Sequence, residues 1–451
     1  MQPEDIFTAQ ELAHFRNELD LRRPAGSHEP GKWMVNPLNR SIGRDEGHFQ
    51  TRVKLRDITL RTMEQMPGVA NTAEQRLDLL RALVEAGVPE VQTSAFRRGH
   101  TMQEMRAEVR LAKSINPHCQ MVYGGLVKRE DMDQAIEAGY DILQSWTAAY
   151  LGGAIPLFAG AVYHRVWKGQ DWHDLKFPAS EQEFIDRPCR LIREAVQQGL
   201  KVSMGLNLLA LANEDFVKRY ARAIRDAGAF EIMLADSTAG TAPEAFSRIV
   251  HSIKEAAPGL QICIHAHNLY GLGAACSVAG ARAGAEVIEV SVNGYEVGPA
   301  GCQASLTGMA VALQALYGVD TGVDLSKLAH TSDVAARMTG VPTPWNEPVI
   351  GSATLDSAQP DEFELEALFD PLIHGSFVPE AVGLSRRIEV GVVTGPLGMW
   401  NKLEQLGITV QREHVMPILE QCWDAMTKSG GRVSEQDIRK IAAGVLLGSG
   451  Q

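Results

Sequence analysis

The chain has 451 residues, of which 45% are hydrophobic and 22% charged, which excludes a disordered, collagen-like or coiled-coil protein. Its 43 basic and 55 acidic side chains give a formal net charge of −12, which disfavours nucleic acid and anionic membranes as partners. The six cysteines lie far apart without a CxxC pair, as is typical of reduced cytoplasmic thiols. The polar, acidic N-terminus is unlike a signal peptide, and no apolar run approaches the roughly 18 residues of a membrane span. We therefore expect a cytoplasmic protein.

Residues 1–50 are expected to form an irregular N-terminal arm with a short helix near 8–20. From about residue 52, short runs rich in Val, Ile, Leu and Tyr are typical of buried strands. These runs cover 52–58, 89–95, 119–125, 140–146, 200–206, 230–236, 261–267 and 286–292. Amphipathic helical runs lie between and after them, at 72–87, 101–115, 128–139, 181–199, 213–228, 242–257 and 271–284.

This alternation predicts an α/β fold, a (β/α)8 TIM barrel over residues 51–330, with a doubly wound open sheet as the alternative. Residues 147–180 combine aromatic residues and glycines without clear periodicity, which predicts a lid or an interface arm. A proline-rich stretch opens a linker or subdomain over 331–395. Residues 396–451 are predicted to form a small helical C-terminal subdomain.

The candidate catalytic residues follow the strand runs, because chemistry in a parallel barrel occurs at the carboxyl ends of its strands. His265 and His267 end the seventh run. Their i, i+2 spacing points both side chains to one face, where two imidazoles can bind one cation. The alternative is one buried structural histidine and one solvated loop histidine.

Two further candidates follow the first and eighth runs. Arg61 follows the first, where a guanidinium can hold a carboxylate or stabilise an enolate; the alternative is a surface cation. The segment VNGYEVGPAGCQASL follows the eighth and predicts a tight loop whose amides could bind an anion, with Cys302 and Gln303 facing the site. Its alternative is a plain glycine-rich loop around a buried cysteine.

In combination these segments resemble one family. DITLRTMEQMPG, LADSTAGTAP and IHAHN are similar to motifs of the 2-isopropylmalate synthase and homocitrate synthase family, whose wider group includes hydroxymethylglutaryl-CoA lyase. PVIGSATLDSA and FVPEAVGLSRRIEVGVVTG follow in the order of that family's downstream subdomains. The resemblance extends over residues 53–445.

The resemblance implies a barrel that binds a divalent metal and forms or breaks a carbon–carbon bond beside a carboxylate or thioester. It places metal ligands at His265 and His267, and enolate stabilisation at Arg61. In such enzymes the metal chelates a 2-oxo acid or its hydroxy-acid product and polarises the carbonyl. The short C-terminus leaves no room for the family's leucine-feedback domain, so we expect no such regulation.

Several of the family's acidic or catalytic positions carry other residues here. They are Thr62 for the metal-binding Asp, Gln92 for the Glu ending strand 2, Leu206 and Asn207 for the acidic pair after strand 5, Leu269 for the last Asp of H-x-H-N-D, Cys302 and Gln303 near the Asn after strand 8, and Pro360 for the histidine that helps deprotonate acetyl-CoA. Two imidazoles and a hydroxyl are a poor Mg²⁺ site, because Mg²⁺ needs anionic oxygens.

Three interpretations of the altered site stay open. Glu64, Asp57 or Cys302 completes a softer Zn or Mn site; a substrate carboxylate supplies the missing oxygens; or there is no metal, and Arg61 and the histidines bind an anionic substrate directly.

We predict an acyltransferase or carbon–carbon lyase of aldol or Claisen type that acts on a small 2-oxo or hydroxy carboxylic acid, with an acyl-CoA as a second candidate partner. Cleavage, or condensation with a different donor, fits the loss of the histidine at 360 better than acetyl-CoA condensation. The expected roles are catalysis by Arg61 and Gln65, metal binding (Zn, Mn or Mg) by His265 and His267, and substrate binding by Gln92, Asn207, Asn293 and Thr62. We also expect a homodimer. The alternative function is a catalytically degenerate barrel that binds a metabolite or a partner.

Overall fold

The computed structural model describes residues 7–45, 49–94, 99–126, 129–148, 162, 165–166, 168–169, 180–296, 301–357, 370, 372–373, 375–385 and 387–448. The loop predicted at 147–180 lies largely outside these ranges, and Pro360 lies wholly outside them. The contacts divide the chain into two compact units, one formed by Met1–Pro37 with Pro344–Gln451 and the other by Leu38–Thr343.

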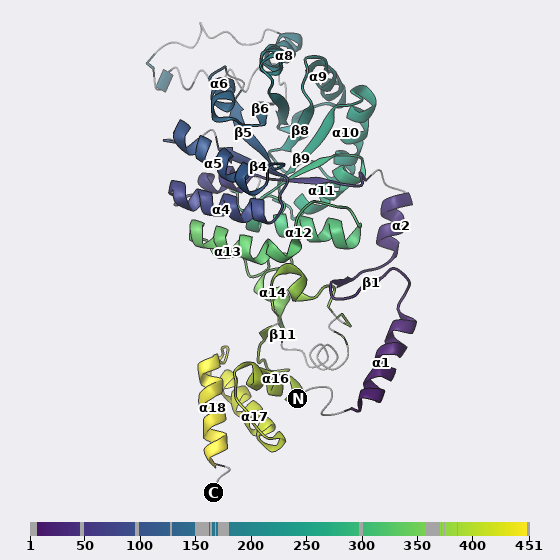
Figure 1. Cartoon of the computed structure of the whole chain (residues 1–451), viewed down its shortest axis with the longest axis vertical. Coiled ribbons are helices and arrows are strands. Elements are labelled where there is room, and N and C mark those ends of the chain that lie inside the picture. Colours follow the sequence, from purple (N-terminus) through teal and green to yellow (C-terminus); the bar gives the residue numbers. More distant parts are fainter. Residues whose placement is uncertain are drawn as a thin grey trace. The chain divides into compact units, whose positions relative to one another are not determined.

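The second unit is built around a closed barrel of eight parallel strands (Figure 1). The strands are β3 (Lys54–Asp57), β4 (Glu90–Ser94), β5 (Gln120–Leu126), β6 (Ile142–Ala148), β7 (Lys201–Asn207), β8 (Glu231–Asp236), β9 (Gln261–Ala266) and β10 (Val287–Val290). Each strand pairs with the next in sequence, and β10 pairs with β3 to close the barrel. The predicted (β/α)8 architecture is therefore confirmed.

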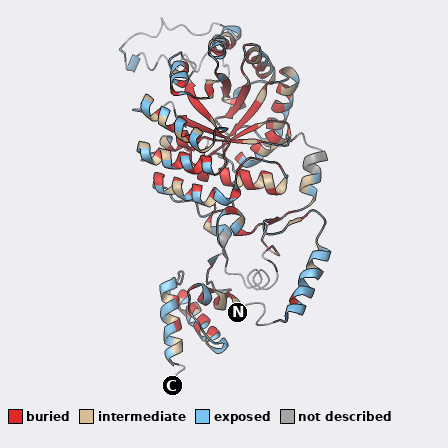
Figure 2. Ribbon diagram, viewed as in Figure 1, coloured by how far each residue is buried: buried red, intermediate tan, exposed pale blue. Residues whose placement is uncertain are grey.

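Amphipathic helices surround the strands and turn their apolar sides inward (Figure 2). They are α4 (Ala73–Glu85), α5 (Met102–Ile115), α6 (Arg129–Ala138), α8 (Glu181–Gln197), α9 (Glu214–Asp226), α10 (Pro243–Ala256), α11 (Gly273–Arg282), α12 (Leu306–Val311) and α13 (Leu328–Thr339), with α2 (Leu38–Asp45) and the single turn α3 (Thr59–Thr62) elsewhere in the unit. Capping boxes at Thr72 and Thr101 begin α4 and α5 at the residues where the sequence predicts these helices.

The interior of the barrel is polar at its centre. The Arg56 guanidinium, fully buried, lies 2.6 Å from Glu90, 2.8 Å from Glu231 and 3.3 Å from Glu289. Burial opposes the charge of Arg56, but the three carboxylates outweigh burial and raise the pKa of Arg56. The buried charge of Arg56 is therefore compensated by the surrounding carboxylates, as a charge in a low-dielectric interior must be.

The first unit combines α1 (Ala9–Arg22) with the C-terminal part of the chain. Its short strands are β1 (His28–Glu29), β2 (Trp33–Met34), β11 (Asp356–Ser357) and β12 (Arg387–Ile388), and its other helices are α14 (Ser352–Leu355), α16 (Pro396–Gln405), α17 (Arg412–Ser429) and α18 (Glu435–Gly448). The last three helices enclose a core that includes Met399, Leu403, Ile418 and Cys422.

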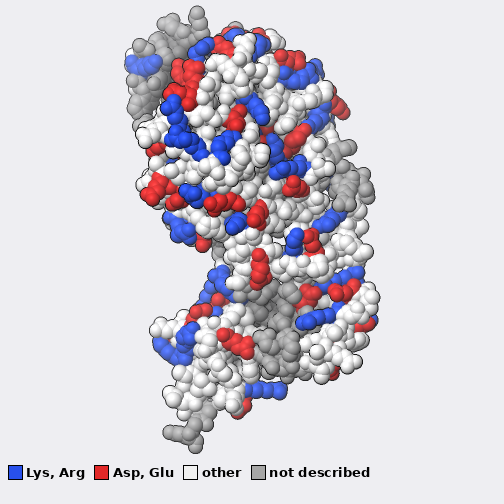
Figure 3. Space-filling view, viewed as in Figure 1, with Lys and Arg blue, Asp and Glu red and all other residues white. Residues whose placement is uncertain are grey.

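Acidic and basic side chains are interspersed on the face of the molecule shown in Figure 3. This mixture agrees with the formal net charge of −12. Among the described residues, none of the helices has the length and apolarity that crossing a bilayer requires.

Candidate metal and carboxylate site

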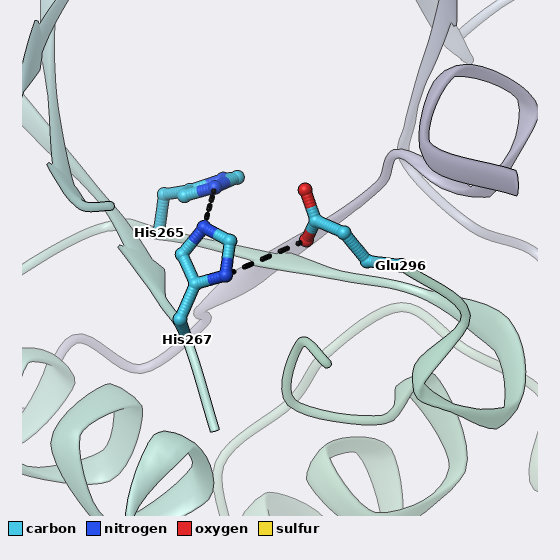
Figure 4. A group of neighbouring side chains, drawn as sticks. All are labelled: His265, His267 and Glu296. Carbon is cyan, nitrogen blue, oxygen red and sulfur yellow. Dashed lines mark hydrogen bonds and ion pairs between the residues drawn. The ribbon is translucent and has the colours of Figure 1, made fainter. Parts of the chain in front are cut away.

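The two histidines of the HAH segment converge at the end of β9 (Figure 4). The Nε2 atoms of His265 and His267 lie 3.2 Å apart, and the rings meet edge to face with centroids 5.0 Å apart. His265 is buried and His267 is largely so. The structure therefore brings these two predicted ligands together, as their i, i+2 spacing requires.

Glu296 completes this cluster from the segment after β10. Its Oε2 lies 4.0 Å from His267 Nδ1, and the side chain points toward the imidazole (Figure 4). Glu296 is 6% exposed, and its Oε2 accepts no hydrogen bond from the described residues. One potential ligand atom from each of the three side chains lies within 4.8 Å of the others, so the group could hold a metal ion. Sequence reasoning singled out this loop but not Glu296.

Glu289 of β10 orients the His265 ring through a hydrogen bond to Nδ1. His265 Nδ1 lies 2.6 Å from Glu289 Oε2. Burial raises the pKa of Glu289, but the hydrogen bond and charge of His265, with Arg56 and Arg61, outweigh burial and hold the pKa at about 2. An ionised Glu289 only accepts hydrogen bonds, so Nδ1 of His265 carries the proton. The unprotonated Nε2 of His265 therefore faces His267 and Gln303, and the Nε2 of Gln303 lies 2.9 Å from it.

Arg61 reaches the same region from α3. Its Nε donates to Gln92 Oε1 at 2.5 Å; Gln92 in turn donates to Gln144, which donates to Glu289 Oε1 at 2.8 Å. Burial and the charge of His265 lower the pKa of His267, and the positive charge of Arg61 contributes in the same direction. Arg61 therefore lies near enough to His267 for its charge to act on the imidazole, at the carboxyl ends of the strands.

A buried arginine fixes the backbone around Arg61. Arg76 of α4 donates from Nη1 to the Leu60 carbonyl at 2.9 Å and to Glu64 Oε1 at 2.8 Å. Its Nε donates to Glu108 of α5 at 3.0 Å. Since Leu60 and Glu64 lie on either side of Arg61 in the chain, Arg76 anchors both ends of the turn that presents it.

Other predicted residues lie apart from the cluster or are engaged elsewhere. Thr62 Oγ1 donates to the Tyr295 carbonyl at 2.7 Å. Asn293 has a φ of 55°. Its side-chain amide donates to Ser332 and Thr343 and accepts from the Ser332 hydroxyl, rather than bonding to the histidines. Gln65 is exposed, and Asn207 is half-buried at the end of β7.

The residues considered as additional metal ligands are not part of the group formed by His265, His267 and Glu296. Glu64 binds Arg76, and Asp57 accepts hydrogen bonds from Thr59. Cys302 is exposed, whereas the other five cysteines are buried. Within the described part of the chain, Glu296 is the carboxylate that groups with both histidines, whereas Glu289 contacts His265.

Comparison with known proteins agrees with the fold and the motifs. A sequence model of the HMGL-like family matches residues 170–335. The 2-phosphonomethylmalate synthase of Streptomyces rubellomurinus is 30% identical over 392 residues, which are 86% of this chain and 97% of that protein. A probable 2-isopropylmalate synthase of Ignicoccus hospitalis is 28% identical over 408 residues, 90% of this chain and 95% of that protein.

Among solved structures, the HMG-CoA lyase of Bacillus subtilis superposes with a TM-score of 0.52 at 17% identity, covering 66% of this chain and 96% of that one, a likeness that shows the barrel fold. The fold and motifs thus define an HMGL-like barrel enzyme. The chain belongs to the 2-isopropylmalate synthase and homocitrate synthase family, as its motifs predict. It is an enzyme of carbon–carbon bond chemistry, of the acyltransferase or lyase type. The family generally uses a divalent metal.

Proposed function

We propose that this enzyme forms or cleaves a carbon–carbon bond in a small 2-oxo acid or its hydroxy-acid product, at a divalent metal held by His265, His267 and Glu296. The observation that carries the proposal is the convergence of two imidazoles and a buried carboxylate oxygen without a hydrogen-bond donor, on the side of the barrel that Arg61 also faces. A buried carboxylate oxygen that accepts no hydrogen bond is costly, and a cation beside it would compensate that cost.

The donor set favours a borderline metal. Two imidazole nitrogens and one carboxylate suit Zn²⁺ or Mn²⁺ better than Mg²⁺, which prefers mostly oxygen ligands. Glu289 would hold the His265 ring in the tautomer that leaves Nε2 as the ligand atom, a support that metal-binding histidines usually have. We therefore propose Zn²⁺ or Mn²⁺ as the resident ion.

The chain's own residues would bind and orient the substrate. A bound divalent metal would supply Lewis-acid polarisation of a carbonyl. Arg61 would hold the carboxylate, since its Nη atoms stay available when Nε donates to the neutral Gln92 amide. Gln92 and Asn207 would lie beside the substrate, whereas Thr62 and Asn293 would shape the site through Tyr295 and Ser332. Gln65 is exposed, so its proposed catalytic role would require its side chain to move toward the substrate.

The reaction partner, the assembly and the location belong to the same proposal. We propose an acyl-CoA as the second substrate or as the product of cleavage, a homodimer, and a cytoplasmic location. Incubation of the metal-loaded enzyme with acetyl-CoA and a series of 2-oxo acids, followed by detection of released thiol, tests condensation. Light scattering of the purified full chain tests the dimer.

Metal binding is tested first, because it separates the enzyme from a degenerate barrel. Calorimetric titration with Mn²⁺ and Zn²⁺ should give a stoichiometry near one, and His265→Ala and Glu296→Gln should each weaken the metal affinity by about tenfold or more. The exposed residues His118 and Glu255 provide matched controls, since His118→Ala and Glu255→Gln should leave the affinity unchanged.

The substrate is tested on the same preparations. A thermal-shift screen with pyruvate, other 2-oxo acids and their hydroxy-acid products should show stabilisation that depends on the metal. Absence of both metal binding and stabilisation by any of these acids would exclude this proposal and favour a degenerate barrel that binds a different metabolite or a protein.

A further inference from the structure

Trp146 occupies part of the barrel interior at the end of β6. It is paired in register with Gly205 of β7, and Gly124 lies on β5 at the other side. A Cβ added to Gly205 would overlap the indole Cδ1, and one added to Gly124 would lie 2.8 Å from Cη2. The indole therefore crosses two positions that are open only because both residues are glycine.

The indole lies beside the strand that carries the histidine pair. It packs against a small buried cluster that includes Ala235 and Cys263. Ala235 is paired in register with His265, and Cys263 precedes His265 by two residues on the same strand, so both face the barrel interior beside it. Trp146 is therefore a neighbour of the layer from which His265 projects.

The indole also meets Arg61. The guanidinium carbon of Arg61 lies 5.5 Å from the centroid of the Trp146 ring, within the roughly 6 Å range of a cation–π contact. Gln92 fixes the same guanidinium through Nε. A molecule whose carboxylate is held by Arg61, and whose carbonyl faces the histidines, would thus have the indole beside the rest of its carbon chain.

We propose that Trp146 limits the length of the 2-oxo acid that this enzyme accepts, so that short-chain acids bind and longer ones are rejected. The inference rests on the proposed function. Met233 Cε lies beside the Gly205 position, and the Gln92 amide lies beside the Gly124 position. These two side chains leave the indole little room to move aside. Trp146 thus determines specificity without taking part in the chemistry.

Chain length is tested by binding rather than turnover. The probes are pyruvate, 2-oxobutyrate, 2-oxovalerate and 2-oxohexanoate, titrated into the Mn²⁺-loaded wild type and the Trp146→Ala variant. The wild-type affinity should fall by about tenfold or more toward the longer acids, since a single methylene can be worth roughly 10–200-fold in a tight pocket. Trp146→Ala should bind the longer acids about tenfold more tightly than the wild type does. Trp146→Phe, which keeps a flat ring, should stay close to the wild-type profile.

A double-mutant cycle tests whether the indole itself is responsible. Gly205→Ala should displace the indole from Arg61 and weaken pyruvate binding, because the new methyl group and the ring cannot share the space. In the Trp146→Ala background the same methyl group has room, so its effect should largely disappear. Mn²⁺ affinity, measured on every variant, should be unchanged, which shows that the histidine cluster is intact.

The outcomes separate this inference from the proposed function. If pyruvate binds and the wild type and Trp146→Ala have the same chain-length profile, the inference is overturned and the proposed function stands. If Mn²⁺ binds but none of the four acids binds to any variant, both are overturned. Additive effects of Gly205→Ala and Trp146→Ala would likewise remove Trp146 as the wall of the site.

Discussion

Asp57 is expected to make the barrel less stable at alkaline than at acidic pH. It is 0% exposed at the carboxyl end of β3, and its carboxylate accepts hydrogen bonds from Thr59 N and Oγ1, both at 2.9 Å. Burial raises the pKa of Asp57 to about 7, and the two hydrogen bonds from Thr59 oppose that rise only in part.

The magnitude follows from linkage. A carboxyl whose folded pKa exceeds its ordinary value of 3.8 contributes stability below that value, and the contribution is lost as the pH rises through about 7. The difference between the two pKa values corresponds to about 4 kcal/mol in the free energy of unfolding. Asp57→Asn keeps the shape and cannot ionise. We therefore expect the variant to gain up to about 4 kcal/mol relative to the wild type between about pH 4 and pH 8.

Amide hydrogen exchange of β3 and β10 is the suitable assay, because it follows the barrel separately from the other unit. The exchange of these strands should slow in Asp57→Asn at the higher pH and change little at the lower pH. Asp133→Asn, on the exposed side of α6, is the matched control and should show no such difference. A stability difference between Asp57→Asn and the wild type that is the same at both pH values would refute the reasoning.

Three further predictions concern the site. Glu289→Gln should weaken Mn²⁺ binding by about 10–100-fold, because the amide no longer holds the His265 tautomer, and calorimetry measures this. Arg76→Lys should weaken pyruvate binding by about tenfold while leaving Mn²⁺ affinity unchanged, since Lys cannot hold Leu60 and Glu108 at once; a parallel loss of both affinities would contradict the anchoring role. Gln92→Glu should weaken pyruvate binding by about tenfold or more, because the new carboxylate neutralises Arg61. Gln92→Leu is the uncharged comparison, and a higher affinity of Gln92→Glu for pyruvate would contradict the prediction.

The fold could be predicted because its signals are local. The strand runs of the barrel are short and alternate regularly with helical runs. The helical runs begin and end within a few residues of α4, α5 and α9, where caps and glycines stand in the sequence. By contrast, α13 falls mostly within residues 331–395, for which the sequence predicts a linker or subdomain. It packs in the barrel unit, and only the tertiary structure shows this.

The site could be predicted only where its geometry is local. The approach of His265 to His267 follows from two residues on one strand. Glu296 approaches them only because β10 closes the barrel beside β9, and the path of the following segment depends on that closure. The contact of Trp146 with Arg61 depends in the same way on three strands and on two glycines, which no short window of sequence reveals.

The loss of acidic residues that the motifs indicate has a physical counterpart in the structure. Gln92 is the residue for which the motif resemblance implies a glutamate in the family, and its amide holds the Arg61 side chain without neutralising it. A glutamate there would pair with the guanidinium and compete with any carboxylate that binds from outside. Negative charge beside the imidazoles comes instead from Glu289 and Glu296. The Gln92 amide leaves the positive charge of Arg61 in place, which is what the proposed binding of a substrate carboxylate requires.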